Sequence, residues 1–131
     1  LTCFFTPAIR IDYQPRESWR GLFFQMFRYG FGRSRLGRKH PRSLTLPSLV
    51  PALWLIWLTA TLAMGFFFSV FAIVFAVSAA GYVAAVLMES LRLSWRRPWR
   101  FVPRVPFAFF AIHLGFGWGF LRERLAPPRR R

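Results

Sequence analysis

The chain has 131 residues, of which 55% are hydrophobic, and its 19 Lys and Arg face only 4 Asp and Glu, giving a net charge of +15. Soluble globular domains are about 45–50% apolar and about 25% charged with mixed signs, so this composition argues against a soluble domain. Positions 44–88 contain no charged residue and no His. Because one bilayer crossing takes about 20 apolar residues, this block is long enough for two crossings. The single Cys, Cys3, excludes an internal disulfide framework.

The amino-terminal stretch shows no secretion signal. The first residue is Leu1 rather than Met, and the residues up to Glu17 contain neither a long apolar run nor a cleavage site. We therefore expect the chain to be a fragment, the C-terminal part of a longer protein. Residues 1–16 include the weakly alternating sequence FFTPAIRIDY, which predicts extended structure as the last edge of a missing domain.

An amphipathic helix is predicted next, over residues 19–29. Its apolar residues follow the spacing i, i+3, i+4, i+7 and i+8, and they are Trp19, Leu22, Phe23, Met26 and Phe27. Ser18 can cap this helix and Gly30 can end it. A helix with Trp and Phe on one face and Arg on the other tends to lie in the membrane interface, where basic residues meet anionic headgroups. Residues 17–43 are therefore assigned to an interfacial helix and a basic segment.

The uncharged block at 44–88 predicts a transmembrane hairpin. Its helices are expected over about 47–64 and 67–88, with a tight turn near Gly65. The turn carries no charge, whereas the preceding basic segment and the loop at 89–104 are rich in Arg. The positive-inside rule then places both flanks in the cytoplasm. The alternative is one long helix buried in a soluble complex. Such a helix would need charged residues on its solvated face, and this block contains none.

A shorter apolar run at 105–121 predicts a third hydrophobic helix, followed by a basic tail at 122–131. A re-entrant or interfacial helix would keep both of its ends in the cytoplasm. We favour a crossing that packs on the hairpin, because later charges weigh less than early ones in setting orientation. Gly115 and Gly119 place two small residues on one face, which lets another helix approach closely. His113 is interpreted as a neutral side chain bonded to a neighbouring helix, with a functional role as the alternative.

Three residues on the amphipathic helix form a candidate binding patch. Gln25, Arg28 and Tyr29 are spaced i, i+3 and i+4, so their side chains are expected to converge. A guanidinium binds a phosphate well, an aromatic ring stacks on a sugar, and an amide bonds a hydroxyl. The alternative is that all three merely form the solvated flank of an interfacial helix. The spacing alone leaves both interpretations open.

The sequence Gln-Met-Phe-Arg-Tyr at 25–29 resembles the Q-x-x-R-W motif of membrane-bound family 2 glycosyltransferases, with Tyr in place of Trp. Other segments are similar to the C-terminal half of the succinoglycan (exopolysaccharide) biosynthesis type of these enzymes. They are YQPRES at 13–18, FRYG-x-GR at 27–33, KHPR at 39–42 and HLGFGWGF at 113–120, the last resembling the final hydrophobic helix. The resemblance covers most of the chain, from about residue 7 to residue 121.

This resemblance implies the C-terminal membrane region of a GT-A-type hexosyltransferase. The missing α/β domain would bind a nucleotide-sugar donor and a divalent metal, Mg or Mn, through an Asp-x-Asp element. By the same resemblance, Arg28 would contact the donor diphosphate, Tyr29 would stack near the acceptor sugar, and Gln25 would help to position it. The acceptor would be a polyprenyl-linked glycan. The enzyme would be a multi-pass protein of the bacterial inner membrane, with its N-terminal segment in the cytoplasm.

The chain by itself lacks the groups for sugar transfer. Asp12 is the single Asp, no pair of carboxylates is placed for acid–base chemistry, and no Cys/His cluster has metal-ligand spacing. We therefore expect no catalytic residue and no bound cofactor in this fragment. The alternative function is a non-enzymatic small membrane protein, such as an assembly or transporter subunit. Nucleic acid is not an expected partner, because the arginines flank apolar spans and no basic face is free of the bilayer. The predicted fold is an all-α membrane protein with an interfacial amphipathic helix, a transmembrane hairpin and a third short hydrophobic helix.

Overall fold

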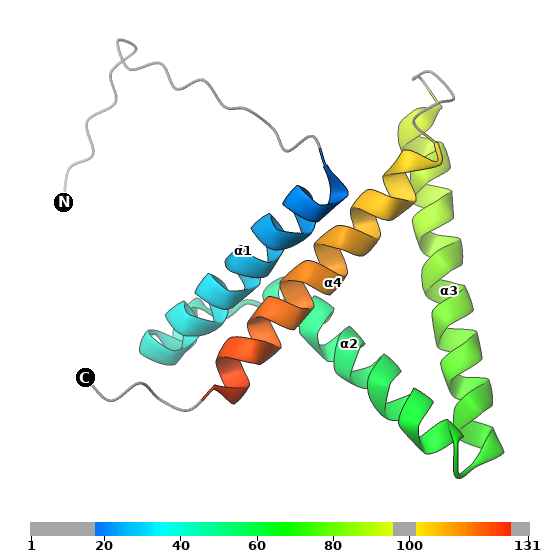
Figure 1. The fold of residues 1–131 in the computed structure, drawn as a ribbon, viewed down its shortest axis with the longest axis horizontal. Helices are drawn as coiled ribbons and strands as arrows, with labels where there is room; N and C mark the ends of the chain where they lie inside the picture. The colour runs from blue at the N-terminus through cyan, green and yellow to red at the C-terminus, as the bar shows by residue number, and fades with distance from the viewer. Residues whose placement is uncertain (1–17, 96–101, 127–131) are drawn as a thin grey trace.

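The computed structural model describes residues 18–95 and 102–126, so the extended segment expected at 1–16 lies outside the described residues. The described ranges are all-α, as the sequence predicted. Four helices follow one another, and a short 3-10 helix at Pro41–Ser43 links the first two (Figure 1). They are α1 (Trp19–Lys39), α2 (Leu46–Gly65), α3 (Ser69–Ser94) and α4 (Arg104–Leu125). By length and composition, α2, α3 and α4 can each cross a membrane.

Helices α2 and α3 form the predicted hairpin. The turn follows Gly65, where a Cβ atom would lie only 3.1 Å from the Cα of Ala72, so the absent side chain lets the two helices meet closely. Thr45 and Ser48 cap the start of α2 reciprocally, which satisfies backbone N–H groups that have no intrahelical partner. Helix α3 continues to Ser94, so the first part of the predicted loop at 89–104 is helical, and residues 96–101 of that loop lie outside the described residues.

The two hairpin helices diverge from the turn, and α4 closes the open side (Figure 1). Aromatic side chains fill the space between α2 and α3, where the ring centroids of Trp54 and Tyr82 are 4.2 Å apart. Trp57 Nε1 also donates a hydrogen bond of 3.1 Å to Ser78 Oγ. The ring of Tyr82 is also nearly perpendicular to that of Phe110 in α4, with the two centroids 5.4 Å apart. One tyrosine therefore joins all three apolar helices.

Helix α1 is ten residues longer than the predicted segment 19–29, and Gly30 does not end it. Gly30 is buried in mid-helix, because the backbone of α4 occupies the space that a side chain would need. A Cβ atom there would lie 2.8 Å from the carbonyl carbon of Phe116. The helix ends instead at His40, directly before Pro41, whose ring cannot continue a helix. The prediction of a glycine C-cap is therefore wrong, since this glycine serves helix packing.

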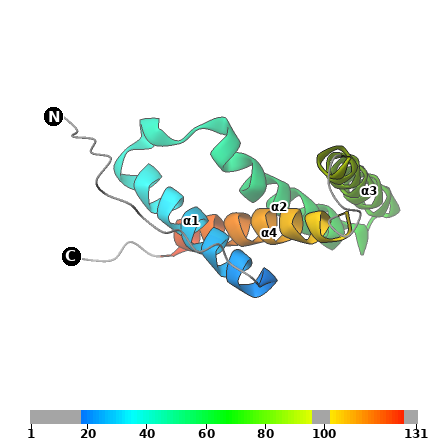
Figure 2. The same cartoon turned by 90° about the horizontal axis from the view of Figure 1, so that it is seen from above.

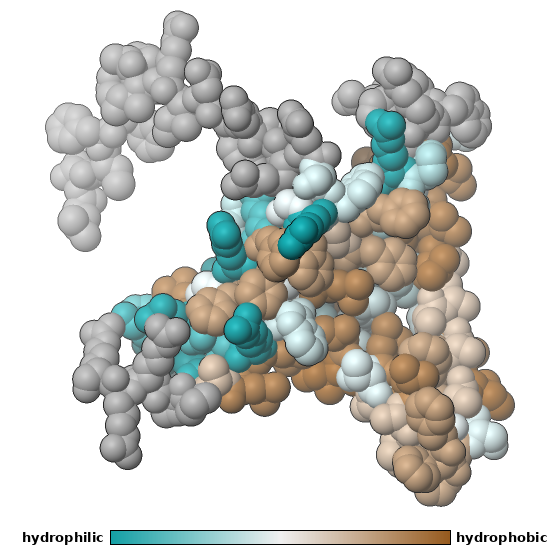
Figure 3. Space-filling view, in the orientation of Figure 1, coloured by the Kyte–Doolittle hydropathy of each residue, from teal (hydrophilic) through white to brown (hydrophobic). Residues whose placement is uncertain are grey.

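Most large apolar side chains remain exposed. Ala52, Val86 and Phe120 are buried apolar residues, whereas long stretches of α2 and α3 present Leu, Ile, Val and Phe at the surface. Figure 3 shows this hydrophobic surface over the hairpin and hydrophilic residues gathered along α1. An apolar exterior of this extent is expected where lipid rather than water surrounds the helices. The fold thus separates a lipid-compatible hairpin from a cationic helix.

Candidate functional site

Helix α1 lies alongside α4, and the two helices run in the same direction (Figures 1 and 2). At their first turns the rings of Trp19 and Phe107 are 6.2 Å apart. Further along, glycines of α4 bring the two backbones close together. A Cβ atom at Gly115 would lie 2.6 Å from the carbonyl oxygen of Phe23, and one at Gly119 would lie 2.8 Å from the carbonyl carbon of Phe27. The close approach expected at the two glycines is present, and its main partner is α1.

Helix α4 also packs on the hairpin, through the glycine between those two. A Cβ atom at Gly117 would lie 2.7 Å from the carbonyl oxygen of Pro51 in α2. Gly115 and Gly119 therefore contact α1, whereas Gly117 contacts α2, because residues two apart on a helix point to different sides. The contact with the hairpin that the sequence predicted exists, but α1 covers a longer part of α4.

The apolar stripe of α1 consequently faces protein. A Cβ atom at Gly115 would lie 3.2 Å from the Cβ of Met26, and the guanidinium of Arg122 in α4 lies 5.6 Å from the centroid of the Phe27 ring. The sequence analysis placed this stripe against lipid. Helix α4 covers part of this stripe: Phe23, Met26 and Phe27 are half-buried, whereas Trp19 stays 47% exposed, so the helix has both a protein contact and an apolar surface left for the membrane interface.

Arg38 holds the carboxyl end of α4. Its Nη2 atom donates to the carbonyl oxygens of Arg124 at 2.8 Å and Ala126 at 3.0 Å, and it also contacts the carbonyl of Glu123. These carbonyls have no partner within the helix, and they carry the negative end of the helix dipole. A guanidinium is therefore a favourable cap at this position. Sequence reasoning missed this role, because Arg38 is separated from its partners by more than eighty residues.

The candidate patch lies on the side of α1 turned away from α4. Gln25 Nε2 donates a hydrogen bond of 3.1 Å to the hydroxyl of Tyr29. Tyr29 is 56% exposed, so one face of its ring is available to a ligand. Arg28 is also exposed, and among the described residues it makes no hydrogen bond or ion pair. The structure thus brings the amide and the ring into contact, and the guanidinium of Arg28 is exposed on the same helix.

Further cations extend this surface along the outer side of α1. Its exposed basic residues are Arg20, Arg28, Arg35 and Lys39. Arg20 lies 5.8 Å from the centroid of the Phe24 ring, which holds its guanidinium near the start of the helix. No acidic side chain of α1 opposes these charges. Such a face attracts phosphate groups, whether they belong to a diphosphate or to lipid headgroups.

His113 lies between α3 and α4. Its Nδ1 atom is 2.8 Å from the carbonyl oxygen of Phe109 and 3.2 Å from the hydroxyl of Tyr82. A carbonyl oxygen only accepts hydrogen bonds, so the shorter contact requires the proton on Nδ1. The side chain bridges to a neighbouring helix, which is the interpretation that the sequence favoured over a functional role.

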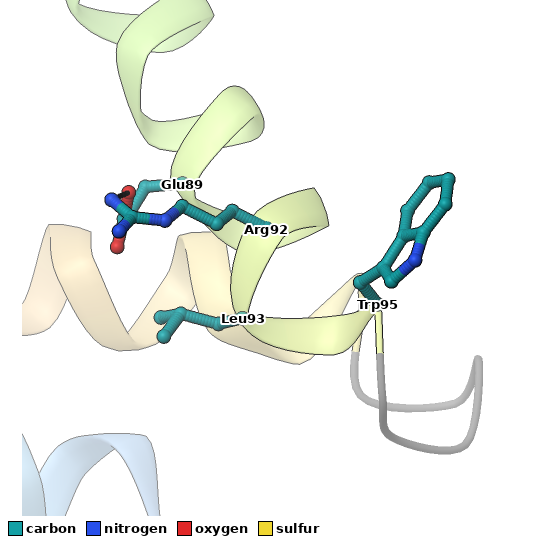
Figure 4. A pocket seen from close by; sticks show the side chains of 4 residues that line it. All are labelled: Glu89, Arg92, Leu93 and Trp95. Atoms are coloured by element: carbon teal, nitrogen blue, oxygen red, sulfur yellow. Dashed lines mark ion pairs between the residues drawn. The ribbon is translucent and has the colours of Figure 1, made fainter.

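The carboxylate of Glu89 is already paired. It lies 3.5 Å from Arg92 one turn later in α3, and both side chains line an open recess together with Leu93 and Trp95 (Figure 4). Figure 4 shows Trp95 directed away from the ion pair. Among the described residues that line this recess, Glu89 is the single carboxylate, so they provide no pair of carboxylates for acid–base chemistry.

Metal ligands are also dispersed over the described part of the chain. Within residues 18–95 and 102–126, no three His, Cys, Asp or Glu side chains come together. These residues therefore offer no ligand set for the divalent metal that the glycosyltransferase resemblance implies. Searches against protein-family models, curated proteins and solved structures found no match to the chain.

Proposed function

We propose that this chain is the membrane-anchoring region of a glycosyltransferase of the bacterial inner membrane. The enzyme transfers a sugar from a nucleotide-sugar donor to a polyprenyl-linked glycan during exopolysaccharide biosynthesis, and α1 forms one wall of its substrate site. The observation that carries the proposal is the arrangement on α1. One side of the helix is fixed to α4 through glycines, and the other presents a bonded amide and ring beside an exposed guanidinium.

Arg28 is the residue we assign to the phosphate-bearing substrate. Its guanidinium is exposed, and among the described residues it makes no ion pair. Bidentate bonding to a diphosphate also stabilises the charge that develops on this group as it leaves. Arg20 and Arg35 on the same helix add a positive potential that raises the local concentration of an anionic donor.

Tyr29 and Gln25 are assigned to the acceptor sugar. The hydrogen bond from Gln25 Nε2 to the Tyr29 hydroxyl restricts the ring, so its exposed face is presented in one orientation. A sugar ring stacks on an aromatic face, and the Gln25 amide bonded to Tyr29 helps to position the sugar against that face. The Tyr in place of the family's Trp retains a stacking plane of smaller area.

The proposed position at the membrane follows from the hairpin. Helix α1 leads into α2 through the short segment Pro41–Ser43, at the end of the hairpin opposite its turn. The positive-inside rule assigns that end to the cytoplasm, where nucleotide sugars are found. A polyprenyl-linked acceptor presents its sugar at headgroup level on the same side. The catalytic carboxylate and the divalent metal are supplied by another domain in this proposal.

The decisive experiment replaces Arg28 in the complete enzyme and measures sugar transfer to the lipid-linked acceptor. Arg28→Ala is expected to lower kcat by about 100-fold, the typical effect of removing one charge-stabilising donor. The matched control is Arg35→Ala, which removes the same contribution to the positive potential of this helix but no group that we assign to direct contact with the diphosphate. Transfer that is equally active in both variants would refute the role of Arg28. Arg28→Lys keeps the charge but not the bidentate geometry, and we expect it to restore only part of the rate.

A further inference from the structure

We infer that α4 does not cross the membrane but lies along the cytoplasmic surface with α1 packed on it, seated in the headgroup layer of the bilayer. The described residues then cross the membrane twice, through α2 and α3, and the carboxyl end of α4 stays on the side of α1. This differs from the crossing that the sequence favoured for this helix. The inference rests on the hairpin and on helix packing, and it is independent of the proposed enzymatic function.

The first support is the place of α4 in the fold. A hairpin that crosses twice brings the beginning of α2 and the end of α3 to the same side of the membrane. Figure 1 shows α4 closing the open side of the hairpin, from the end of α3 to beyond the beginning of α2. The contact between Gly117 and the carbonyl of Pro51 fixes this passage near the first turns of α2. A helix that passes from the end of α3 to the beginning of α2 lies across the cytoplasmic end of the hairpin. It does not run parallel to the two membrane-spanning helices.

The second support is the cationic helix on α4. The two helices stay in contact from the pair Trp19 and Phe107 to the bonds that Arg38 makes with the end of α4. If α4 spanned the bilayer, α1 would have to enter the hydrocarbon with it. Six basic side chains belong to α1, and they are Arg20, Arg28, Arg33, Arg35, Arg38 and Lys39. Charged side chains at bilayer depth are strongly unfavourable, so the pair is stable only at the surface.

The third support is the free side of α4. Phe107, Trp118 and Leu125 are spaced i, i+11 and i+18, so they share one face of the helix. They are 62%, 57% and 82% exposed, although the Phe107 ring also lies 6.2 Å from the ring of Trp19 in α1. This apolar face runs from the first turn of α4 to its last. A spanning helix needs apolar residues on every side that meets lipid, whereas an interfacial helix needs one such stripe.

The chemistry at the end of this stripe fits the boundary between acyl chains and phosphates. An open groove there is lined by Trp118, Leu121, Arg122 and Leu125. Its apolar side chains suit an acyl chain, and the exposed guanidinium of Arg122 suits the phosphate above it. We therefore assign a phospholipid of the cytoplasmic leaflet as the occupant of this groove.

Depth measurements on spin labels test the inference directly. The full chain with Cys3→Ser is labelled singly at Phe107→Cys, Trp118→Cys or Leu125→Cys and reconstituted in vesicles of phosphatidylethanolamine and phosphatidylglycerol. Val77→Cys in α3, which is exposed and lies in a span, is the deep reference. We expect three equal, shallow depths on α4. A crossing would separate Phe107 from Trp118 by about 16 Å along the bilayer normal, and a gradient of that size overturns the inference.

A second measurement does not depend on the stripe. Ala126→Cys is compared with Leu46→Cys at the start of α2 and with Phe67→Cys in the hairpin turn, each in the chain that carries Cys3→Ser. Intact cells are treated with a thiol reagent that does not cross membranes. Ala126→Cys is expected to react only after permeabilisation, as Leu46→Cys does. Reaction in intact cells together with Phe67→Cys would place the end of α4 outside and overturn the inference.

Discussion

The glycine contacts between α1 and α4 make a sharp prediction about stability. Gly30→Ala places a methyl group where a Cβ atom would lie 2.8 Å from the carbonyl carbon and 3.0 Å from the Cα of Phe116. Carbon atoms normally approach to about 3.5–4.0 Å, so the helices must separate by about 1 Å. Both obstructing atoms belong to the backbone of α4, which cannot rotate out of the way as a side chain can.

Gly32→Ala is the matched control. It lies in the same helix, and a Cβ atom there meets nothing within 4 Å. Both substitutions raise helix propensity by about 1 kcal/mol, so this gain cancels when the two variants are compared. The remaining difference is the overpacking at position 30, for which we expect about 1–3 kcal/mol of lost stability. Gly32→Ala alone is expected to be neutral or stabilising.

Two assays distinguish lost packing from other effects. Reversible unfolding of the purified chain in detergent gives the difference in free energy between the Ala variants. Disulfide formation between Trp19→Cys and Phe107→Cys, with Cys3→Ser, reports how close the helices are, since the two native rings lie 6.2 Å apart. We expect Gly30→Ala to slow this cross-link and Gly32→Ala to leave it unchanged. Equal stability and equal cross-linking in the two variants would show that the close helix contact does not exist.

Three further substitutions test other contacts. Arg38→Gln is expected to lose about 1–2 kcal/mol, because charged hydrogen bonds to the end of α4 are removed at a partly exposed site, and amide hydrogen exchange should rise there but not in Arg35→Gln. Tyr82→Phe keeps the ring contacts and removes the hydroxyl 3.2 Å from His113 Nδ1, so a thermal melt should show a loss of about 1 kcal/mol or less. A loss above 3 kcal/mol would mean that this hydroxyl has a role beyond the bond seen here. Tyr29→Trp is expected to retain sugar transfer in the complete enzyme and Tyr29→Ala to lose it, since a stacking plane is needed, and equal activity of the two would refute stacking.

The distribution of charged residues along the sequence was sufficient to predict the membrane hairpin. An uncharged block of 45 residues at 44–88 has few alternatives to a membrane hairpin, because lipid requires every backbone polar group to be bonded within the segment. The hairpin and its turn after Gly65 appear where the sequence placed them. The spacing of Gln25 and Tyr29 likewise predicted their contact, because residues four apart on a helix are neighbours whatever surrounds them.

The glycines show where prediction from local sequence patterns fails. Gly30 follows an amphipathic stretch and matches the pattern of a helix end, yet α1 continues through it to Lys39. A missing side chain signals either a turn or a close approach, and a single sequence does not distinguish the two. Gly115 and Gly119 were interpreted correctly as a contact surface because two small residues four apart rarely serve a turn.

The sequence by itself determined that α1 has one apolar face and one cationic face, and that α4 is apolar enough to meet lipid. Only the tertiary structure decided that the apolar face of α1 is seated on α4, and that Arg38 caps a helix more than eighty residues away. The physical reason is that hydrophobic periodicity records which side of a helix avoids water. Lipid and protein satisfy that requirement equally well, so the partner is fixed by shape, here by glycines that let two backbones touch.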